Sequence, residues 1–387
     1  MNILVVKLSS IGDVVHTLPA VASIRRRHPQ ARISWVVDSR ASAILKDSPV
    51  IDELIEVDSI RLPRGLFDRQ AMRDAHTRLK QVRGNPGQGL NGGQGPAARN
   101  GSGAPDIAID FQGLVKSGLI AFLSGANRRI GFASCDLRER ASRYLLTDQA
   151  PTGSAVHVID KNLELADLIW PGTCEGASRH EPESSDRARR YEFPISVSEE
   201  DAHYIEEMIT GAGRAAIINP GGGWVTKLWP AERYGELADW LWHDCSIRSF
   251  VTYGPGEEGL ASDVVSSSRS GTCRALPSTL KQFVALARRA ALFVGGDTGP
   301  LHLAAATGTP IVGLYGPTSP ERNGPFSKSD VTVGRDLWCR TACYRRKCWH
   351  WECMEIPIDE VKQAIRHRLS MPDAFAAGAA RINTFPV

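Results

Sequence analysis

The block from Gly295 to Thr318, GGDTGPLHLAAATGTPIVGLYGPT, carries the sharpest chemical signal in the sequence. A buried strand runs into a turn here, and a helix of small residues follows. The first turn of a helix has unpaired N–H groups and a partial positive charge, so it can bind a phosphate. The residues that would form this site are Asp297, Thr298, Gly299, Pro300 and His302. In the simpler interpretation Asp297 and Thr298 only cap the helix, but the glycine-rich turns around it favour the phosphate site.

A second glycine-rich turn, NPGGGWVTKLWP, follows another predicted strand at residues 219–230. Its three glycines let the backbone come close to an anion, and Lys227 supplies a positive charge nearby. The turn lacks the Lys-Ser/Thr ending of a nucleotide-hydrolase P-loop, which disfavours a Mg²⁺-dependent nucleotide hydrolase. A lone loop lysine is usually solvated, so both interpretations of Lys227 stay open.

The third motif, KLSSIGDVVHTLPA at residues 7–20, places Asp13 after the first predicted strand. The commoner role for an Asp at the start of a helix is to cap it. At the carboxyl edge of a sheet, however, a carboxylate can also take a proton from an attacking hydroxyl group. Gly12 permits a tight turn and the close approach of a substrate.

Basic side chains gather in the first half of the chain. They are Arg61, Arg64, Arg128, Arg129, Arg138, Arg140 and Arg143. Most arginines on a nearly neutral protein are solvated. Those in loops after strands, however, could hold an acidic acceptor through bidentate contacts.

Four of the eight cysteines lie within fifteen residues near the end of the chain. They are Cys339, Cys343, Cys348 and Cys353. Their gaps of three, four and four residues differ from the paired spacing of zinc ribbons and fingers. We expect reduced cysteines that pack together and no metal site, with a structural metal as the less favoured alternative.

Apolar runs rich in Val and Ile alternate with segments of helical period, which predicts parallel sheets covered by helices on both faces. In the first half, the predicted strands are residues 3–6, 33–37, 53–57 and 107–110, and the predicted helices are 14–27, 41–45 and 116–123. In the second half, the predicted strands are 215–219, 249–253, 291–294 and 311–315, and the predicted helices are 234–243, 280–289 and 300–307. Two such α/β domains predict a cleft at the carboxyl ends of their strands.

Length and composition agree with two domains. A chain of 387 residues exceeds what one hydrophobic core usually serves, and 42% hydrophobic with 23% charged residues excludes a fully disordered chain, a collagen or a membrane bundle. We predict domains at 1–190 and 191–387, with a flexible glycine-rich insertion at 84–103 and a linker at about 171–190. The formal net charge of +3 gives no sign of a nucleic-acid partner. The N-terminus lacks the pattern of a secretory signal, which predicts a cytoplasmic protein.

Together these motifs resemble the ADP-heptose:lipopolysaccharide heptosyltransferases of glycosyltransferase family 9. Proteins of this family are inverting enzymes of the α/β GT-B fold, with two Rossmann-like, doubly wound domains facing across a cleft. The resemblance spans nearly the whole chain and rests on KLSSIGDVVHTLPA, IDFQGLVKSGLIAFLSGANRRIGF, KLWP, GPGEE, the Gly295 block and the clustered cysteines. The GDTGP-x-HLAAA block is highly specific to the family, and DFQGLVKS is most similar to the branch that adds the first heptose.

The resemblance implies roles for the residues at matching positions. Asp13 is similar to the family's catalytic base, and Lys227 to its diphosphate-neutralising lysine. The implied donor-binding residues are Gly12, Thr226, Glu257, Glu258, Asp297, Thr298, Gly299, Pro300 and His302. The implied acceptor-binding residues are Ser10, His16, Arg61, Arg64, Gln112 and Arg138.

The implied reaction moves heptose from ADP-heptose to a lipid-linked Kdo acceptor, with no obligatory metal, on the cytoplasmic face of the inner membrane. Another acceptor or another nucleotide-sugar donor is the main alternative. A nucleotide-dependent oxidoreductase would need G-x-G-x-x-G after the first strand, where this chain has SSIGD. A glycan-binding protein without catalysis would not need Asp13 and Lys227, whose presence argues modestly against that class.

Overall fold

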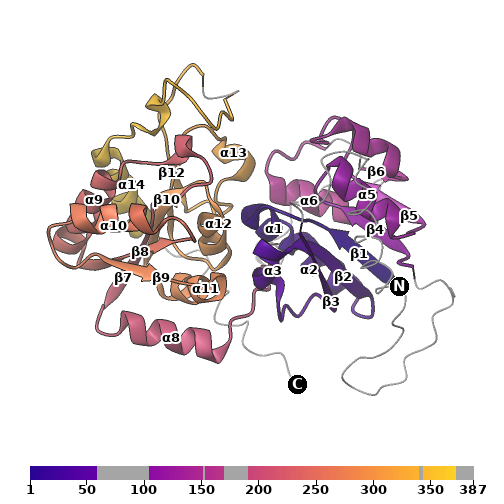
Figure 1. The fold of residues 1–387 in the computed structure, drawn as a ribbon, viewed down its shortest axis with the longest axis horizontal. Helices are drawn as coiled ribbons and strands as arrows, with labels where there is room; N and C mark the ends of the chain where they lie inside the picture. Colours follow the sequence, from indigo (N-terminus) through magenta and orange to yellow (C-terminus); the bar gives the residue numbers. More distant parts are fainter. Residues whose placement is uncertain (59–103, 151–152, 170–190, 340–342, 372–387) are drawn as a thin grey trace. The chain divides into compact units, whose positions relative to one another are not determined.

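A computed structural model describes residues 1–58, 104–150, 153–169, 191–339 and 343–371. The chain divides into two compact units, Met1–Ser196 and Val197–Val387 (Figure 1). The predicted insertion at 84–103, Arg61, Arg64 and the predicted linker at about 171–190 lie outside the described residues. Among the described residues, no helix has both the length and the apolar character needed to cross a membrane.

The first unit is built on a six-stranded parallel sheet with the order β3-β2-β1-β4-β5-β6. Its strands are β1 (Asn2–Val6), β2 (Arg32–Asp38), β3 (Glu53–Val57), β4 (Ile107–Asp110), β5 (Arg128–Gly131) and β6 (Asp148–Gln149). The helices described in this unit are α1 (Ile11–Val15), α2 (Leu18–Arg27), α3 (Ser39–Leu45), α5 (Val115–Leu123) and α6 (Val158–Asp167), with a 3₁₀ helix at Arg140–Leu145.

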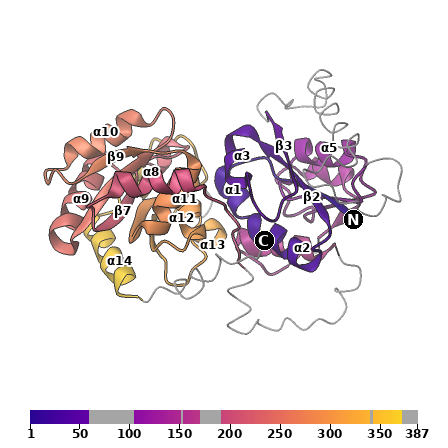
Figure 2. The ribbon, with the colours of Figure 1, turned by 90° about the horizontal axis from the view of Figure 1, so that it is seen from below.

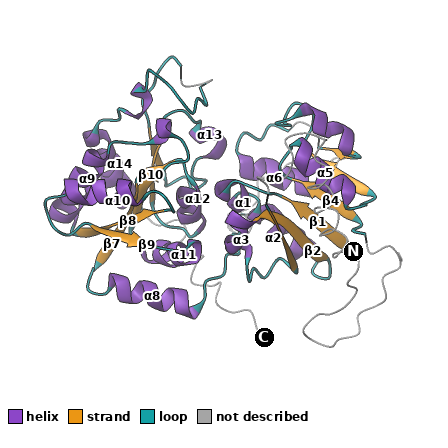
Figure 3. Cartoon of the chain, in the orientation of Figure 1, coloured by secondary structure: helices purple, strands orange, loops and turns teal. Residues whose placement is uncertain are grey.

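The second unit repeats this topology, because its sheet has the order β9-β8-β7-β10-β11-β12 when read from the β9 edge. Its strands are β7 (Arg214–Asn219), β8 (Ile247–Tyr253), β9 (Arg274–Pro277), β10 (Leu292–Gly296), β11 (Ile311–Leu314) and β12 (Val331–Val333). Its helices are α8 (Glu199–Ile209), α9 (Ala231–Cys245), α10 (Glu258–Ser267), α11 (Leu280–Arg289), α12 (Gly299–Ala306), α13 (Pro320–Asn323) and α14 (Ile358–Ser370), with 3₁₀ helices at Val225–Lys227 and Glu352–Met354. Helices flank both sheets (Figure 3), so the predicted pair of doubly wound α/β domains is confirmed.

The predicted helix over residues 14–27 is wrong as a single element. The structure has two helices here, α1 and α2, separated by His16 and Thr17. Pro19 lies in the first turn of α2, where its missing N–H costs nothing because the first N–H groups of a helix have no partner within it. The short α1 therefore forms a separate turn directly after β1, and it carries Asp13.

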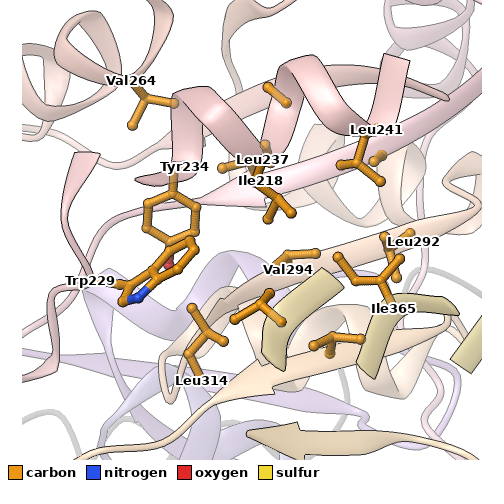
Figure 4. Close-up of a cluster of buried hydrophobic side chains, with 14 of the residues drawn as sticks. Ile218, Trp229, Tyr234, Leu237, Leu241, Val264, Leu292, Val294, Leu314 and Ile365 are labelled. Atoms are coloured by element: carbon orange, nitrogen blue, oxygen red, sulfur yellow. The ribbon is translucent and has the colours of Figure 1, made fainter. Parts of the chain in front are cut away.

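Continuous burial of the strands explains the apolar runs in the sequence. In the second unit, side chains of α9 and the sheet form one core, in which the Trp229 and Tyr234 rings meet edge to face at 4.7 Å between centroids (Figure 4). Edge-to-face contacts of this kind add to the gain from apolar burial. The α8 helix packs against α11 (Figure 2), and Arg289 Nε of α11 lies 2.8 Å from Glu206 Oε1 of α8.

Candidate active site

Both sheets reverse their strand order at one place, between β1 and β4 in the first unit and between β7 and β10 in the second. In open parallel sheets, ligands bind beside the carboxyl ends of the strands at this switch point. The three predicted motifs follow β1, β7 and β10. The topology of each unit therefore places its candidate residues where such a sheet can bind a ligand.

In the first unit, Asp13 is held by hydrogen bonds and by two cations. Its Oδ2 accepts hydrogen bonds from the Ser10 N–H at 3.0 Å and the Ser10 hydroxyl at 3.1 Å. Its Oδ1 lies 3.5 Å from Arg138 Nη2 and 3.9 Å from Lys7 Nζ. The N-cap residue of α1 is Ser10, and Asp13 lies three residues into the helix with its carboxylate bonded back to Ser10. Its other oxygen lies near two positive charges.

The electrostatic environment keeps Asp13 ionised. Burial of the carboxyl raises its pKa, but Lys7, Arg138, the Ser10 N–H and His16 lower it by more. The net pKa of Asp13 is well below the usual range for an aspartate. The group is thus a carboxylate at any physiological pH and a weak proton acceptor until its cations are drawn elsewhere.

A buried polar network at the end of β4 supports the Asp13 turn. Gln112 Oε1 accepts hydrogen bonds from the Leu8 and Ser9 N–H groups at 3.1 and 3.3 Å, and the Lys7 ammonium donates to the Phe111 carbonyl at 2.8 Å. Asp110, which is fully buried, accepts from the Gln112 N–H at 2.8 Å. These bonds join two segments that are about a hundred residues apart in the sequence.

The predicted acceptor residues are brought together only in part. Ser10, Gln112 and Arg138 lie around Asp13 or the turn that carries it. His16 is buried, and its ring meets the His157 ring edge to face at 5.9 Å between centroids. Arg138 is about half exposed, which leaves it accessible to a ligand.

In the second unit, Lys227 and Asp297 form the centre of the candidate site. Lys227 Nζ lies 2.7 Å from Asp297 Oδ2 and donates to the Asp297 carbonyl at the same distance. Asp297 Oδ1 accepts from Asn323 Nδ2 at 2.8 Å and lies 3.1 Å from His302 Nε2. Burial raises the pKa of Asp297, but His302 and Lys227 lower it to well below its usual range. An ionised carboxylate can only accept, so His302 carries its proton on Nε2.

This arrangement is more than a helix cap. Thr298 is the N-cap residue of α12, but its side chain makes no capping hydrogen bond. Its hydroxyl lies 3.4 Å from Asn219 Oδ1, and the Asp297 carboxylate is engaged by Lys227, His302 and Asn323. The Gly299 N–H at the start of α12 is thus not capped by either side chain, and Pro300 of the predicted set has no N–H to cap.

Glu257 joins the two glycine-rich turns of this unit. Its Oε1 accepts from the Gly222 N–H at 3.2 Å, and its Oε2 accepts from the Gly254 N–H at 2.9 Å. A Cβ on Gly221 would overlap the Glu257 carboxylate, so only glycine leaves room for this contact. Glu258 is exposed at the start of α10, where it accepts from the Gly256 N–H at 3.2 Å. Of the two predicted acids, Glu257 is the one that shapes the site.

The cysteine-rich segment touches the same loops. The Thr226 hydroxyl donates to the Arg345 carbonyl at 2.8 Å, and the Tyr344 N–H donates to the Pro317 carbonyl at 3.2 Å. Burial raises the pKa of the Cys353 thiol, and the neighbouring cysteines Cys343, Cys339 and Cys348 raise it further. All four thiols are free, and the described residues contain no cluster of side chains arranged to hold a metal ion.

Sequence reasoning missed three residues of these networks, Lys7, Asn219 and Asn323. Lys7 and Asn219 lie within the quoted motifs, directly after β1 and at the end of β7, and this position was the available signal. Asn219 Nδ2 donates to the Thr252 carbonyl at 3.0 Å and so ties the end of β7 to β8. Asn323 lies 26 residues after Asp297, at the end of α13. No local sequence pattern indicates that it would contact Asp297.

Comparison with known proteins places this geometry in context. The family model of glycosyltransferase family 9 (heptosyltransferase) matches residues 101–351. The chain is 26% identical over 357 residues to lipopolysaccharide heptosyltransferase 1 of Pseudomonas aeruginosa, covering 90% of this chain and 87% of that one. It is also 26% identical over 335 residues to the Escherichia coli K12 protein of the same name, covering 86% and 92%.

Solved structures show the same fold. A family 9 glycosyltransferase from Veillonella parvula matches with a TM-score of 0.74 and 20% identity, covering 95% of this chain and 97% of that one. The E. coli heptosyltransferase WaaC with ADP matches with a TM-score of 0.68 and 23% identity, covering 95% and 100%. The predicted GT-B fold class is therefore confirmed.

Proposed function

The chain belongs to glycosyltransferase family 9, the heptosyltransferases, and from this membership we propose that it transfers heptose from ADP-heptose to a Kdo-containing lipid A acceptor. The acceptor would be the growing inner core of lipopolysaccharide. The observation that carries the proposal is a charged group at the switch point of each sheet: Asp13 as an ionised carboxylate in the first unit, and Lys227 beside the α12 N-terminus in the second.

The second unit has the chemistry to hold the donor. A diphosphate carries more negative charge than the Asp297 carboxylate, so it can compete for the Lys227 ammonium, which is now 2.7 Å from Asp297 Oδ2. The N–H groups at the start of α12 favour the same anion. We propose that Thr298, Glu257 and the exposed Glu258 contact the parts of ADP-heptose other than its diphosphate.

In the proposed reaction, the acceptor hydroxyl oxygen forms a bond to the anomeric carbon of the heptose while the bond from that carbon to the ADP oxygen breaks. The hydroxyl proton goes to Asp13, and the electron pair of the broken bond leaves with ADP. Lys227 and the α12 amides stabilise the negative charge that develops on ADP. A single displacement of this kind inverts the anomeric centre.

The low pKa of Asp13 suits a late proton transfer. A strongly paired carboxylate is too weak a base to ionise a sugar hydroxyl before attack. As the carbon–oxygen bond forms, the hydroxyl becomes acidic and gives up its proton readily. An acidic acceptor that draws Arg138 away from Asp13 would also raise the pKa of Asp13 and make it a better base.

We further propose that the transfer needs no metal ion, since Lys227 and the helix amides supply positive charge at the diphosphate. The lipid-linked acceptor places the proposed reaction at the cytoplasmic face of the inner membrane, with the protein bound peripherally. The relatives from Pseudomonas aeruginosa and Escherichia coli K12 are both named lipopolysaccharide heptosyltransferase 1, and this favours the first heptose as the one transferred.

Addition of the second heptose is the specific alternative. The chain is also 25% identical over 344 residues to lipopolysaccharide heptosyltransferase 2 of E. coli K12. Its identity to the two heptosyltransferase 1 proteins is 26%, which is nearly the same. An acceptor that already carries one heptose separates these possibilities, because an enzyme for the first transfer should release ADP with Kdo₂-lipid A and not with the heptosylated form.

The test is ADP release from ADP-heptose by the purified protein, with and without Kdo₂-lipid A. We expect release that requires the acceptor and persists in EDTA. Asp13→Asn should lower turnover by about 10²–10⁴-fold. The matched control is Asp136→Asn, because Asp136 is partly buried in the same unit and, like Asp13, forms an ion pair, in its case with Lys161 at 2.7 Å. Near wild-type turnover in Asp13→Asn would remove this residue from the base role, and no release with any acceptor would revive a binding function without catalysis.

A further inference from the structure

A short segment between β12 and α14 exposes large aromatic side chains to solvent. Trp338 is 88% exposed, Trp349 90% and Trp351 38%. By contrast, Trp35 and Trp229 are buried, and the Trp229 indole N–H donates to the Ile356 carbonyl at 2.9 Å. We name residues 338–339 and 343–351 the tryptophan segment. Figure 1 shows the described parts of the chain between β12 and α14 at the edge of the second unit.

The same segment carries a run of exposed cations. Arg345, Arg346 and Lys347 follow one another and are all exposed. Indole rings and long basic side chains share one physical property, an apolar body with a polar or charged end. This pairing suits the boundary between lipid acyl chains and anionic headgroups, where the ring enters the apolar layer and the cation meets phosphate.

The tryptophan segment is attached to the loops of the candidate donor site. The Arg346 guanidinium carbon lies 5.3 Å from the centre of the Trp224 ring, and Lys227 Nζ lies 4.6 Å from the same centre. The Thr226–Arg345 hydrogen bond fastens the segment to the residue before Lys227. Arg345 and Arg346 of the tryptophan segment therefore contact the turn that carries Lys227.

We propose that the tryptophan segment docks the protein on an anionic lipid bilayer and so brings the donor site to the membrane surface. The occupant is the bilayer rather than a second copy of the chain. In a twofold dimer the same patch would face itself, and Arg345, Arg346 and Lys347 would meet their own counterparts with like charge. The proposal rests on the proposed function only in that the acceptor is lipid-linked.

Vesicle binding tests the docking without any catalysis. The full-length protein is sedimented with phosphatidylcholine vesicles that do or do not contain phosphatidylglycerol. We expect binding that requires the anionic lipid and weakens with salt. Arg345→Gln with Lys347→Gln should weaken it by about fivefold for each charge removed, and Trp338→Ala with Trp349→Ala should weaken it as well.

The matched control is Arg143→Gln with Tyr144→Ala in the first unit, where an arginine is stacked on a tyrosine that is 76% exposed. This pair should leave vesicle binding unchanged. Wild-type binding by the tryptophan-segment variants, or a loss in the control alone, would overturn the proposal. A lower oligomeric mass in these variants by light scattering, with vesicle binding intact, would also overturn it and make the segment an interface between copies.

A second readout separates this proposal from the proposed function. ADP release is compared for Kdo₂-lipid A embedded in vesicles and for its water-soluble deacylated form. The tryptophan-segment variants should lose rate only with the embedded acceptor, because they leave Asp13 and Lys227 untouched. An equal loss with both acceptors would overturn the docking role. If wild-type protein binds vesicles but uses neither acceptor, the proposed function fails while the docking stands.

Discussion

At the scale of single residues, each candidate reactive group is held by an opposite charge that a substrate must replace. Lys227 is paired with Asp297, and Asp13 with Lys7 and Arg138. Such pairs keep the groups charged and fixed in place while no ligand is bound. A diphosphate or an acidic sugar can bind one of these cations in place of its carboxylate. The pKa of the carboxylate that has lost its cation then rises.

Asp110 behaves in the opposite way and gives a pH-dependent prediction. Its burial raises the pKa to about 6, although Gln112, Ser117, Gly113 and Lys7 lower it. Between about pH 4 and pH 6 the folded protein therefore holds a proton that the unfolded chain has lost, so the free energy of unfolding falls as pH rises through this window. A shift of about two pKa units corresponds to about 3 kcal/mol.

We expect Asp110→Asn to remove this pH dependence, because an amide has nearly the same shape and does not titrate. The measurement is Tm by differential scanning fluorimetry from pH 4.5 to pH 7.5. The difference in Tm, variant minus wild type, should rise with pH by several degrees. A difference that stays constant across the range would show that Asp110 does not titrate there.

At the scale of elements, the structure depends on close contacts between turns. The turn after β7 and the turn after β8 are tied by Glu257, whose carboxylate accepts from Gly222 and Gly254. The glycines in these turns leave room for the Glu257 carboxylate. Replacing a glycine by alanine tests this space without changing any charge. Local pattern located both turns correctly, but it did not show that they touch.

We expect Gly221→Ala to weaken ADP binding by about tenfold, because the new Cβ displaces the Glu257 carboxylate and costs about one hydrogen bond. Gly223→Ala is the matched control in the same turn, since a Cβ at Gly223 meets nothing within 4 Å. Isothermal titration calorimetry with ADP measures both. Equal affinities in the two variants would mean that the Glu257 bridge has no part in binding the nucleotide.

At the scale of the whole molecule, the chain is two units with the same strand order and different residues at their switch points. The first unit presents a carboxylate, and the second a lysine beside a helix N-terminus. This arrangement predicts a division of labour in which the second unit binds the donor and the first activates the acceptor.

The division of labour is tested by donor affinity. We expect Lys227→Ala to weaken binding of ADP-heptose by about 10–100-fold, the value of a hydrogen bond to a charged group, and to lower turnover too. Asp13→Asn should bind the donor as wild type does. Lys362→Ala is the control, because Lys362 has a similar exposure and also forms an ion pair, 2.9 Å from Glu236. An unchanged affinity in Lys227→Ala would mean that Lys227 pairs with Asp297 but has no part in binding the donor.

The sequence by itself determined the fold class and located the turns that carry the candidate site residues. Strand, glycine turn and small-residue helix are local patterns, so the turns that carry Asp13, Lys227 and Asp297 could be located from spacing alone. The predicted helix over residues 14–27 was wrong as a single helix, because hydrophobic periodicity does not show the break at His16 and Thr17 between α1 and α2.

Only the tertiary structure decided what surrounds these residues. Arg138 reaches Asp13 from 125 positions along the chain, and Lys227 reaches Asp297 from 70. A parallel sheet brings such distant segments to one edge, and no pattern within a short window of sequence encodes which side chains will meet there. The charge partners of Asp13 and Asp297, and hence the pKa values of these two carboxylates, follow from that meeting.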